Sequence, residues 1–130
     1  MSKKDITTRA DLEKVVDVFY EKIKLDEILK HMFTNVHWRK HLPVMYDFWE
    51  NVLFHTGNYA GNPMERHQVA HQLRTMEKRH FDQWLLLFNL AIDELYEGEN
   101  VEKLKVRAKN IAIIMQMKIL GIDKSEFEGK

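Results

Sequence analysis

Residues that interrupt helices are rare in this chain, and this feature most constrains its fold. The 130 residues include two prolines and five glycines. These two residue types disfavour a helix interior most strongly, so stretches that lack them are free to be helical. The clearest interruption is segment 56–63, Thr-Gly-Asn-Tyr-Ala-Gly-Asn-Pro, which is typical of a loop. The remainder of the chain favours long helices.

Apolar residues recur at helical spacing from the start of the chain. The first helix is predicted to begin near Thr8 or Ala10, because Thr8 can cap it and Asp11 then lies in its first turn. A short helical turn is predicted over residues 26–32, ending near Phe33.

The second long pattern runs from Trp38 to Leu53 and contains Pro43. Proline lacks an N–H and clashes with the preceding helical turn. The helix is therefore expected either to begin near His41 or to bend there.

The loop at 56–63 ends in a strong signal for a new helix. Asn62 can cap it, Pro63 suits the first helical position, and Glu65 completes a pattern like a capping box. We expect a short helix here that carries His67 and His71.

Two further helices are predicted, over residues 80–96 with Gly98 as a stop and over residues 101–120 with Gly121 as a stop. No strand pattern is found. The sequence predicts an all-α fold with one domain spanning residues 1–130.

Composition excludes several classes of function. The 20 basic and 20 acidic residues balance, so the chain has no overall attraction to nucleic acid or anionic lipid. The absence of cysteine excludes disulfides, thiolate metal sites and cysteine nucleophiles. We see no signal peptide and no apolar run long enough to span a membrane, and we expect a cytoplasmic protein.

The seven histidines are the natural place to look for chemistry. Haem iron needs one firm axial nitrogen and an apolar slot, and His67 on its capped helix can supply the nitrogen, or it can be a plain surface histidine. His67 and His71 lie four residues apart and could instead share a zinc ion, with His80 or a carboxylate as the third ligand. His80 starts the next helix, where it is expected to cap or to face solvent.

Three residues combine a polar tip with a position beside an apolar face. If these faces converge, Tyr20, His41 and Trp84 offer a hydroxyl, an imidazole and an indole N–H to one cavity. Each could equally be a core residue bonded to the backbone. Five aromatic residues could line a flat macrocycle or form ordinary core: Phe19, Phe33, Trp38, Phe48 and Trp49.

Taken together, the chain resembles the truncated haemoglobins, and most closely their third group. The matching residues follow one another in order over nearly the whole chain, which makes the combination more specific than any one motif. They are 19–23 (Phe-Tyr-Glu-Lys-Ile), Phe33, 38–43 (Trp-Arg-Lys-His-Leu-Pro), 47–51 (Asp-Phe-Trp-Glu-Asn), 57–63, His67, 80–85 (His-Phe-Asp-Gln-Trp-Leu) and Arg107-Ala108.

The resemblance implies a two-over-two helical globin sandwich around one haem b. It implies that His67 is the proximal iron ligand and that Tyr20, His41 and Trp84 lie on the distal side, where a small ligand binds. His71 and His80 remain rivals to His67 as the iron ligand.

The resemblance also implies contacts with the macrocycle. Phe33 is expected to pack on it, Met45 to point at its distal face and Arg66 to reach a propionate. Among the aromatic residues, Trp49 is expected to join this lining.

The implied function is binding of dioxygen and other diatomic ligands, such as nitric oxide and carbon monoxide. Three polar donors predict slow ligand release, which favours scavenging, sensing or redox chemistry over bulk oxygen transport. Nitric oxide dioxygenation or a peroxidase-like reaction would need an external reductase. The alternative is a cofactor-free helical module for an apolar ligand or partner helix, which does not explain why Tyr20, His41, His67 and Trp84 occur together.

Overall fold

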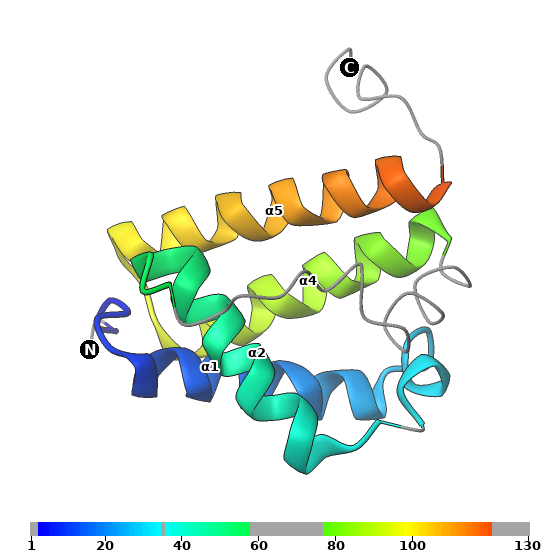
Figure 1. Cartoon of the computed structure of the whole chain (residues 1–130), viewed down its shortest axis with the longest axis horizontal. Helices are drawn as coiled ribbons and strands as arrows, with labels where there is room; N and C mark the ends of the chain where they lie inside the picture. Colours follow the sequence, from blue (N-terminus) through cyan, green and yellow to red (C-terminus); the bar gives the residue numbers. More distant parts are fainter. Residues whose placement is uncertain (1–2, 35, 58–76, 121–130) are drawn as a thin grey trace.

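The computed structural model describes residues 3–34, 36–57 and 77–120. Within these ranges the chain is helical and contains no strand, which confirms the predicted all-α class. The elements are α1 (Arg9–Leu25), the 3-10 turn η1 (Lys30–Phe33), α2 (Trp38–Phe54), α4 (Lys78–Leu95) and α5 (Glu99–Leu120), as Figure 1 shows.

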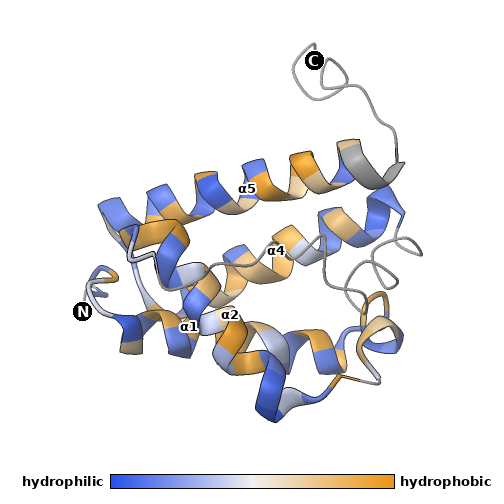
Figure 2. Cartoon of the chain, viewed as in Figure 1, coloured by the Kyte–Doolittle hydropathy of each residue, from blue (hydrophilic) through white to orange (hydrophobic). Residues whose placement is uncertain are grey.

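The helices pack as two pairs, which confirms the predicted two-over-two arrangement. Helix α1 packs on α2 and on α4, while α5 packs on α4 and on α2. In Figure 1, α4 and α5 run side by side in opposite directions, and α2 crosses α1. Blue and orange residues alternate along each helix in Figure 2, as expected of amphipathic helices with one buried side.

Helix α1 begins as predicted. Thr8 is its N-cap and accepts a hydrogen bond from the Asp11 N–H at 3.2 Å, while the Asp11 carboxylate accepts one from the Thr8 N–H at 3.1 Å. This reciprocal pair is a capping box, which satisfies N–H groups at a helix start that have no partner within the helix. The apolar side of α1 forms one wall of the core through Leu12, Val15, Val16, Phe19, Tyr20 and Ile23.

Helix α2 begins where the apolar pattern begins, so the first of the two alternatives at Pro43 fails. Its first residue is Trp38, and the His41 N–H already donates to the His37 carbonyl at 2.8 Å, so a start at His41 is wrong. Pro43 lies inside the helix and leaves the Arg39 carbonyl without its i+4 donor. Both residues are exposed, so that carbonyl remains open to water.

Other predicted boundaries shift by a few residues. The helical turn predicted over residues 26–32 is the shorter element η1, which begins only at Lys30. Helix α4 starts at Lys78 and ends at Leu95, so Gly98 is not its immediate stop. Instead Gly98 has a φ of +146° and lies against Asp5.

The amino-terminal segment forms a second cap that sequence patterns did not indicate. The Asp5 carboxylate accepts hydrogen bonds from the N–H groups of Asn100 at 2.9 Å and Val101 at 3.1 Å, in the first turn of α5. The Glu97 N–H donates to the Lys4 carbonyl at 3.0 Å. Residues far apart in sequence therefore fix the α4–α5 corner.

The predicted helix that starts at Asn62 and carries Arg66, His67 and His71 lies outside the described residues. None of the helices in the described ranges has an apolar stretch of the length that a membrane span needs.

Candidate functional site

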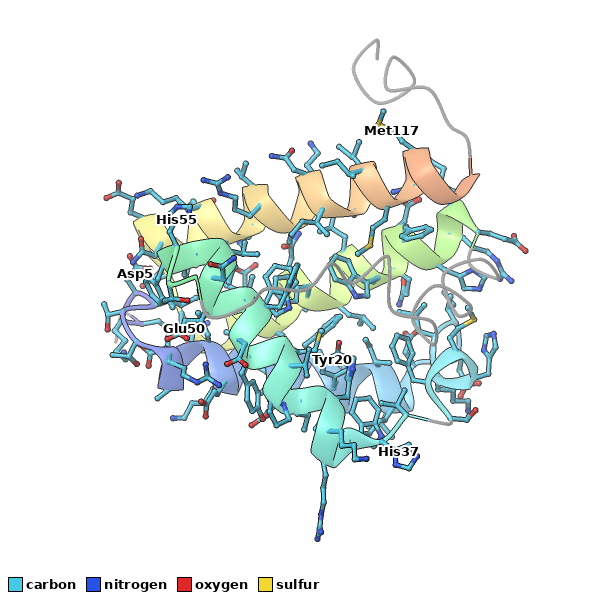
Figure 3. The ribbon with its side chains drawn as sticks, in the orientation of Figure 1. Asp5, Tyr20, His37, Glu50, His55 and Met117 are labelled. Carbon is cyan, nitrogen blue, oxygen red and sulfur yellow. The ribbon has the colours of Figure 1, made fainter. Side chains whose placement is uncertain are left out.

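Tyr20 lies in the last third of α1, where α2 crosses that helix (Figure 3). It is only 6% exposed, yet its hydroxyl reaches a polar partner, His41 Nε2, at 3.1 Å. Burial raises the pKa of the Tyr20 hydroxyl above its ordinary value. The hydroxyl therefore keeps its proton near neutral pH and remains a hydrogen-bond donor.

His41 comes from the first turns of α2 and is half-buried. Its ring meets the ring of Tyr20 edge-on, with centroids 5.2 Å apart, and that of Trp38 at 5.8 Å. Whether Nε2 donates to or accepts from Tyr20 depends on the imidazole tautomer. The structure thus brings together two of the three polar residues that the sequence singled out.

Trp38, which the sequence named only as possible macrocycle lining or ordinary core, is a direct neighbour of this pair. Its ring lies 5.1 Å from that of Tyr20, and the Lys24 ammonium lies 4.6 Å above the indole. The spacing of three residues between Trp38 and His41, one helical turn, is the signal that could have placed both beside Tyr20. Phe33 of η1 lies on another side of Tyr20, with ring centroids 6.2 Å apart.

The ring of Phe19 separates Trp84 of α4 from the Tyr20–His41 pair. Its ring contacts among the described residues are with Phe19 at 5.6 Å, Phe88 at 5.6 Å and Trp49 at 6.2 Å. Phe19 precedes Tyr20 in α1, and the two rings touch at 5.0 Å. Trp84 and Tyr20 therefore share Phe19 as a neighbour.

The two remaining predicted contacts on α2 differ in burial. Trp49 is 2% exposed and stacks on Phe88 at 4.5 Å, within the hydrophobic core. Met45 is half-buried and packs against that core from its edge.

The arrangement fits a haem. Seven residues of α1 are buried but only two of α2, although both helices have 17 residues. Several apolar side chains of η1, α2 and α4 that pack against the core are only half-covered, and they offer surface that a macrocycle would bury. They are Phe33, Trp38, Leu42, Met45, Trp84 and Leu85.

The structure describes only one of the histidines that were considered as metal ligands. His67, Arg66 and His71 lie outside the described residues, so their predicted roles stay predictions. His80 is buried and its Nδ1 accepts the Glu77 N–H at 2.7 Å, so its expected capping role is confirmed and its exposure to solvent is wrong. No cluster of three metal-ligating side chains occurs in the described part of the chain.

Comparison with known proteins agrees with this geometry. The bacterial-like globin family matches residues 4–117. The group 3 truncated haemoglobin ctb of Campylobacter jejuni is 28% identical over 116 residues, which cover 85% of this chain and 89% of that protein. The crystal structure of a group III truncated haemoglobin from Campylobacter jejuni superposes with a TM-score of 0.77 at 26% identity, covering 90% of this chain and 94% of that one. The chain belongs to the bacterial-like globin family and is a haem globin of the group III truncated type.

Proposed function

We propose that this globin binds dioxygen and other diatomic ligands, such as nitric oxide and carbon monoxide, with one haem b held by His67. The observation that carries the proposal is the buried Tyr20 hydroxyl, hydrogen-bonded to His41 Nε2 at 3.1 Å beside half-covered apolar side chains. When bound, the haem would supply an iron centre with a coordination position for a small ligand.

Tyr20 and His41 would control the polarity around that ligand. The Tyr20 hydroxyl is a neutral donor that can turn from His41 towards a ligand whose outer atom carries partial negative charge. Each such donor is worth about 0.5–1.5 kcal/mol net. In this proposal the Trp84 indole N–H is a further donor, and together the three side chains slow ligand release.

Slow release suits scavenging, sensing or redox chemistry better than bulk oxygen transport. Nitric oxide dioxygenation or a peroxidase-like reaction is compatible with these donors and would require a reductase as partner. The macrocycle would contact Phe33, Met45 and Trp49, and Arg66 would pair with a propionate.

The first test is an absorption spectrum of the protein purified with haem supplied during expression, in ferric, ferrous and ferrous carbon monoxide forms. We expect one haem per chain and a Soret band that shifts with carbon monoxide. A chain without stoichiometric haem would favour the cofactor-free helical module instead.

The iron ligand is tested by the variant His67→Ala, with His71→Ala as the matched control four residues further along the chain. We expect His67→Ala to lose most of its haem during gel filtration, because a single axial nitrogen holds the iron. His71→Ala should keep its haem. Equal retention by His67→Ala and the unmodified protein would exclude His67 as the ligand.

A further inference from the structure

The first turn of α4 is capped by an imidazole that is almost fully buried. His80 is the third residue of α4 and is 3% exposed. Its Nδ1 accepts the Glu77 N–H at 2.7 Å, and only an unprotonated ring nitrogen can accept. His80 is therefore neutral in this structure, with its proton on Nε2. In the described part of the chain, that buried Nε2 has no hydrogen-bond partner.

We infer that His80 is an acid-responsive switch: its neutral imidazole forms one half of the capping box with Glu77 at the amino-terminal turn of α4, and protonation removes that half and loosens the turn. A protonated imidazole carries N–H groups on both nitrogens, so Nδ1 would face the Glu77 N–H as a second donor. Its charge would also be buried near the positive end of the helix dipole.

The charged groups around His80 set the direction of the effect. Among the described residues they are Arg79 and Glu77 at the start of α4, and His31 of η1, whose ring lies 6.1 Å from that of His80. Burial lowers the pKa of His80, the charges of Arg79 and His31 lower it further, and Glu77 opposes them.

This direction defines the pH window of the switch. Because the folded pKa is lowered, the unfolded chain takes up the proton first as the pH falls below about 6.5. The folded chain therefore loses stability between that pH and the lower folded pKa of His80. The capping box is complete at neutral pH and loses its His80 half on acidification.

The capped turn is connected to the candidate site through side chains. One turn along α4, Gln83 Nε2 donates to Asp26 Oδ1 at 2.8 Å. The other oxygen of Asp26 accepts the N–H groups of Ile28 at 3.1 Å and Leu29 at 3.0 Å, just before η1. Release of the turn would loosen this connection.

The connected elements carry residues of the candidate site. Element η1 contains Phe33, which packs on Tyr20, and α4 contains Trp84 one turn after His80. Acid would thus loosen the surroundings of Tyr20 from its α4 side. The switch involves only the chain's own groups and does not depend on the proposed function.

The switch can be measured by hydrogen exchange of the Glu77 amide, followed by NMR between pH 7.5 and 5 and corrected for the intrinsic exchange rate. The full-length chain is used as purified, and any haem is kept ferrous with carbon monoxide so that the iron is diamagnetic. We expect the protection of Glu77 to fall about fivefold on acidification, as for loss of a helix cap. The Phe88 amide, in the middle of α4, should not change with it.

Two variants separate the switch from a general effect of acid. His80→Gln keeps a neutral acceptor that does not titrate, so Glu77 should stay protected throughout. His80→Phe keeps a buried ring without an acceptor, so Glu77 should be unprotected even at pH 7.5. A Glu77 amide whose protection does not change with pH in the unmodified protein, or falls equally in His80→Gln, would overturn the inference, as would an Nδ1–H tautomer in the imidazole nitrogen spectrum at pH 7.5.

Discussion

Two regions of this molecule use polar side chains in opposite ways. We call residues 3–11 and 96–101 the amino-terminal corner, and Tyr20, Phe33, Trp38 and His41 the aromatic face. In the corner, the Asp5 carboxylate accepts three backbone N–H groups, those of Ile6, Asn100 and Val101. These bonds tie the start of the chain to the start of α5 (Figure 3).

The corner contains a second carboxylate with many partners. Asp11 accepts from Lys4 Nζ at 2.7 Å, from the N–H groups of Thr7 and Thr8, and from the Tyr96 hydroxyl at 3.3 Å. It is 8% exposed. A buried charge with this many donors holds segment 4–8 and the Tyr96 side chain against the start of α1.

The aromatic face is built around the hydrogen bond from Tyr20 to His41, with rings that meet edge-on. Phe33, Trp38 and His41 stay half-buried. The comparison teaches that the corner fixes the backbone, while the aromatic face leaves apolar surface for a ligand. Mutations in the two regions should therefore affect different properties.

The largest effect is expected for Gly98→Ala in the corner. The added Cβ would lie 2.4 Å from Asp5 Cγ, at a φ of +146° that disfavours other residues. Strain and overpacking together should lower the free energy of unfolding by about 3 kcal/mol, measured by urea denaturation. Haem content per folded chain should not change.

Gly57→Ala is the matched control for this variant. Gly57 also has a positive φ, +75°, but nothing lies within 4 Å of the added Cβ. Backbone strain alone should cost about 1 kcal/mol. If the two variants lose equal free energy of unfolding, the close contact between Gly98 and Asp5 does not contribute to the stability of the corner.

Asp11→Asn should have the next largest effect. Burial alone would raise the pKa of Asp11, but the hydrogen bonds from Lys4, Thr7 and Thr8 outweigh it and lower the pKa well below the ordinary value. The charged form should therefore contribute about 2 kcal/mol at pH 7. This contribution is complete above pH 4 to 5 and is lost as the pH falls through the folded pKa.

The pH dependence of urea unfolding checks this prediction. The gap in stability between the unmodified protein and Asp11→Asn should close in strong acid. Asp82→Asn is the control, because Asp82 forms an exposed ion pair with Lys78 at 3.0 Å and should cost less than about 0.5 kcal/mol. A gap that stays constant with pH would contradict the role of the Asp11 charge.

Local signals in the sequence predicted the helices well. Thr8 and Asp11 lie three residues apart, so their capping box could be predicted from neighbouring residues alone. Pro43 led to the wrong alternative of a helix start near His41. The helix tolerates the hydrogen bond lost at Pro43, because the freed carbonyl lies where the chain is exposed to water. The contact between Asp5 and Asn100 joins positions 95 residues apart and has no local signal.

The candidate site was only partly predictable for the same reason. The family resemblance selected Tyr20 and His41, but the 3.1 Å bond between them depends on how α2 crosses α1. The place of Trp84 behind Phe19 and the contact of Trp38 with Tyr20 are likewise set by packing between helices. The role of His67 stays a prediction that haem retention by its variants will test.

The smallest effect, and the one that tests the aromatic face, is expected for Tyr20→Phe. The ring and its contacts with Phe33 and Trp38 remain, so the free energy of unfolding should change by less than about 1 kcal/mol. Loss of one donor of about 1 kcal/mol should speed dioxygen release about fivefold. Stopped-flow displacement of dioxygen by carbon monoxide measures this rate.

Tyr46→Phe is the control that makes the result specific to the aromatic face. Tyr46 also lies near α1, but its hydroxyl donates to the carboxylate of Asp17. Its removal should leave the rate of dioxygen release unchanged. If both variants release dioxygen at the rate of the unmodified protein, Tyr20 does not face the ligand and its hydroxyl serves only to position His41. If only Tyr20→Phe releases dioxygen faster, then a side chain that contributes little to stability controls ligand release. Stability would then depend mainly on the corner and ligand binding on the aromatic face.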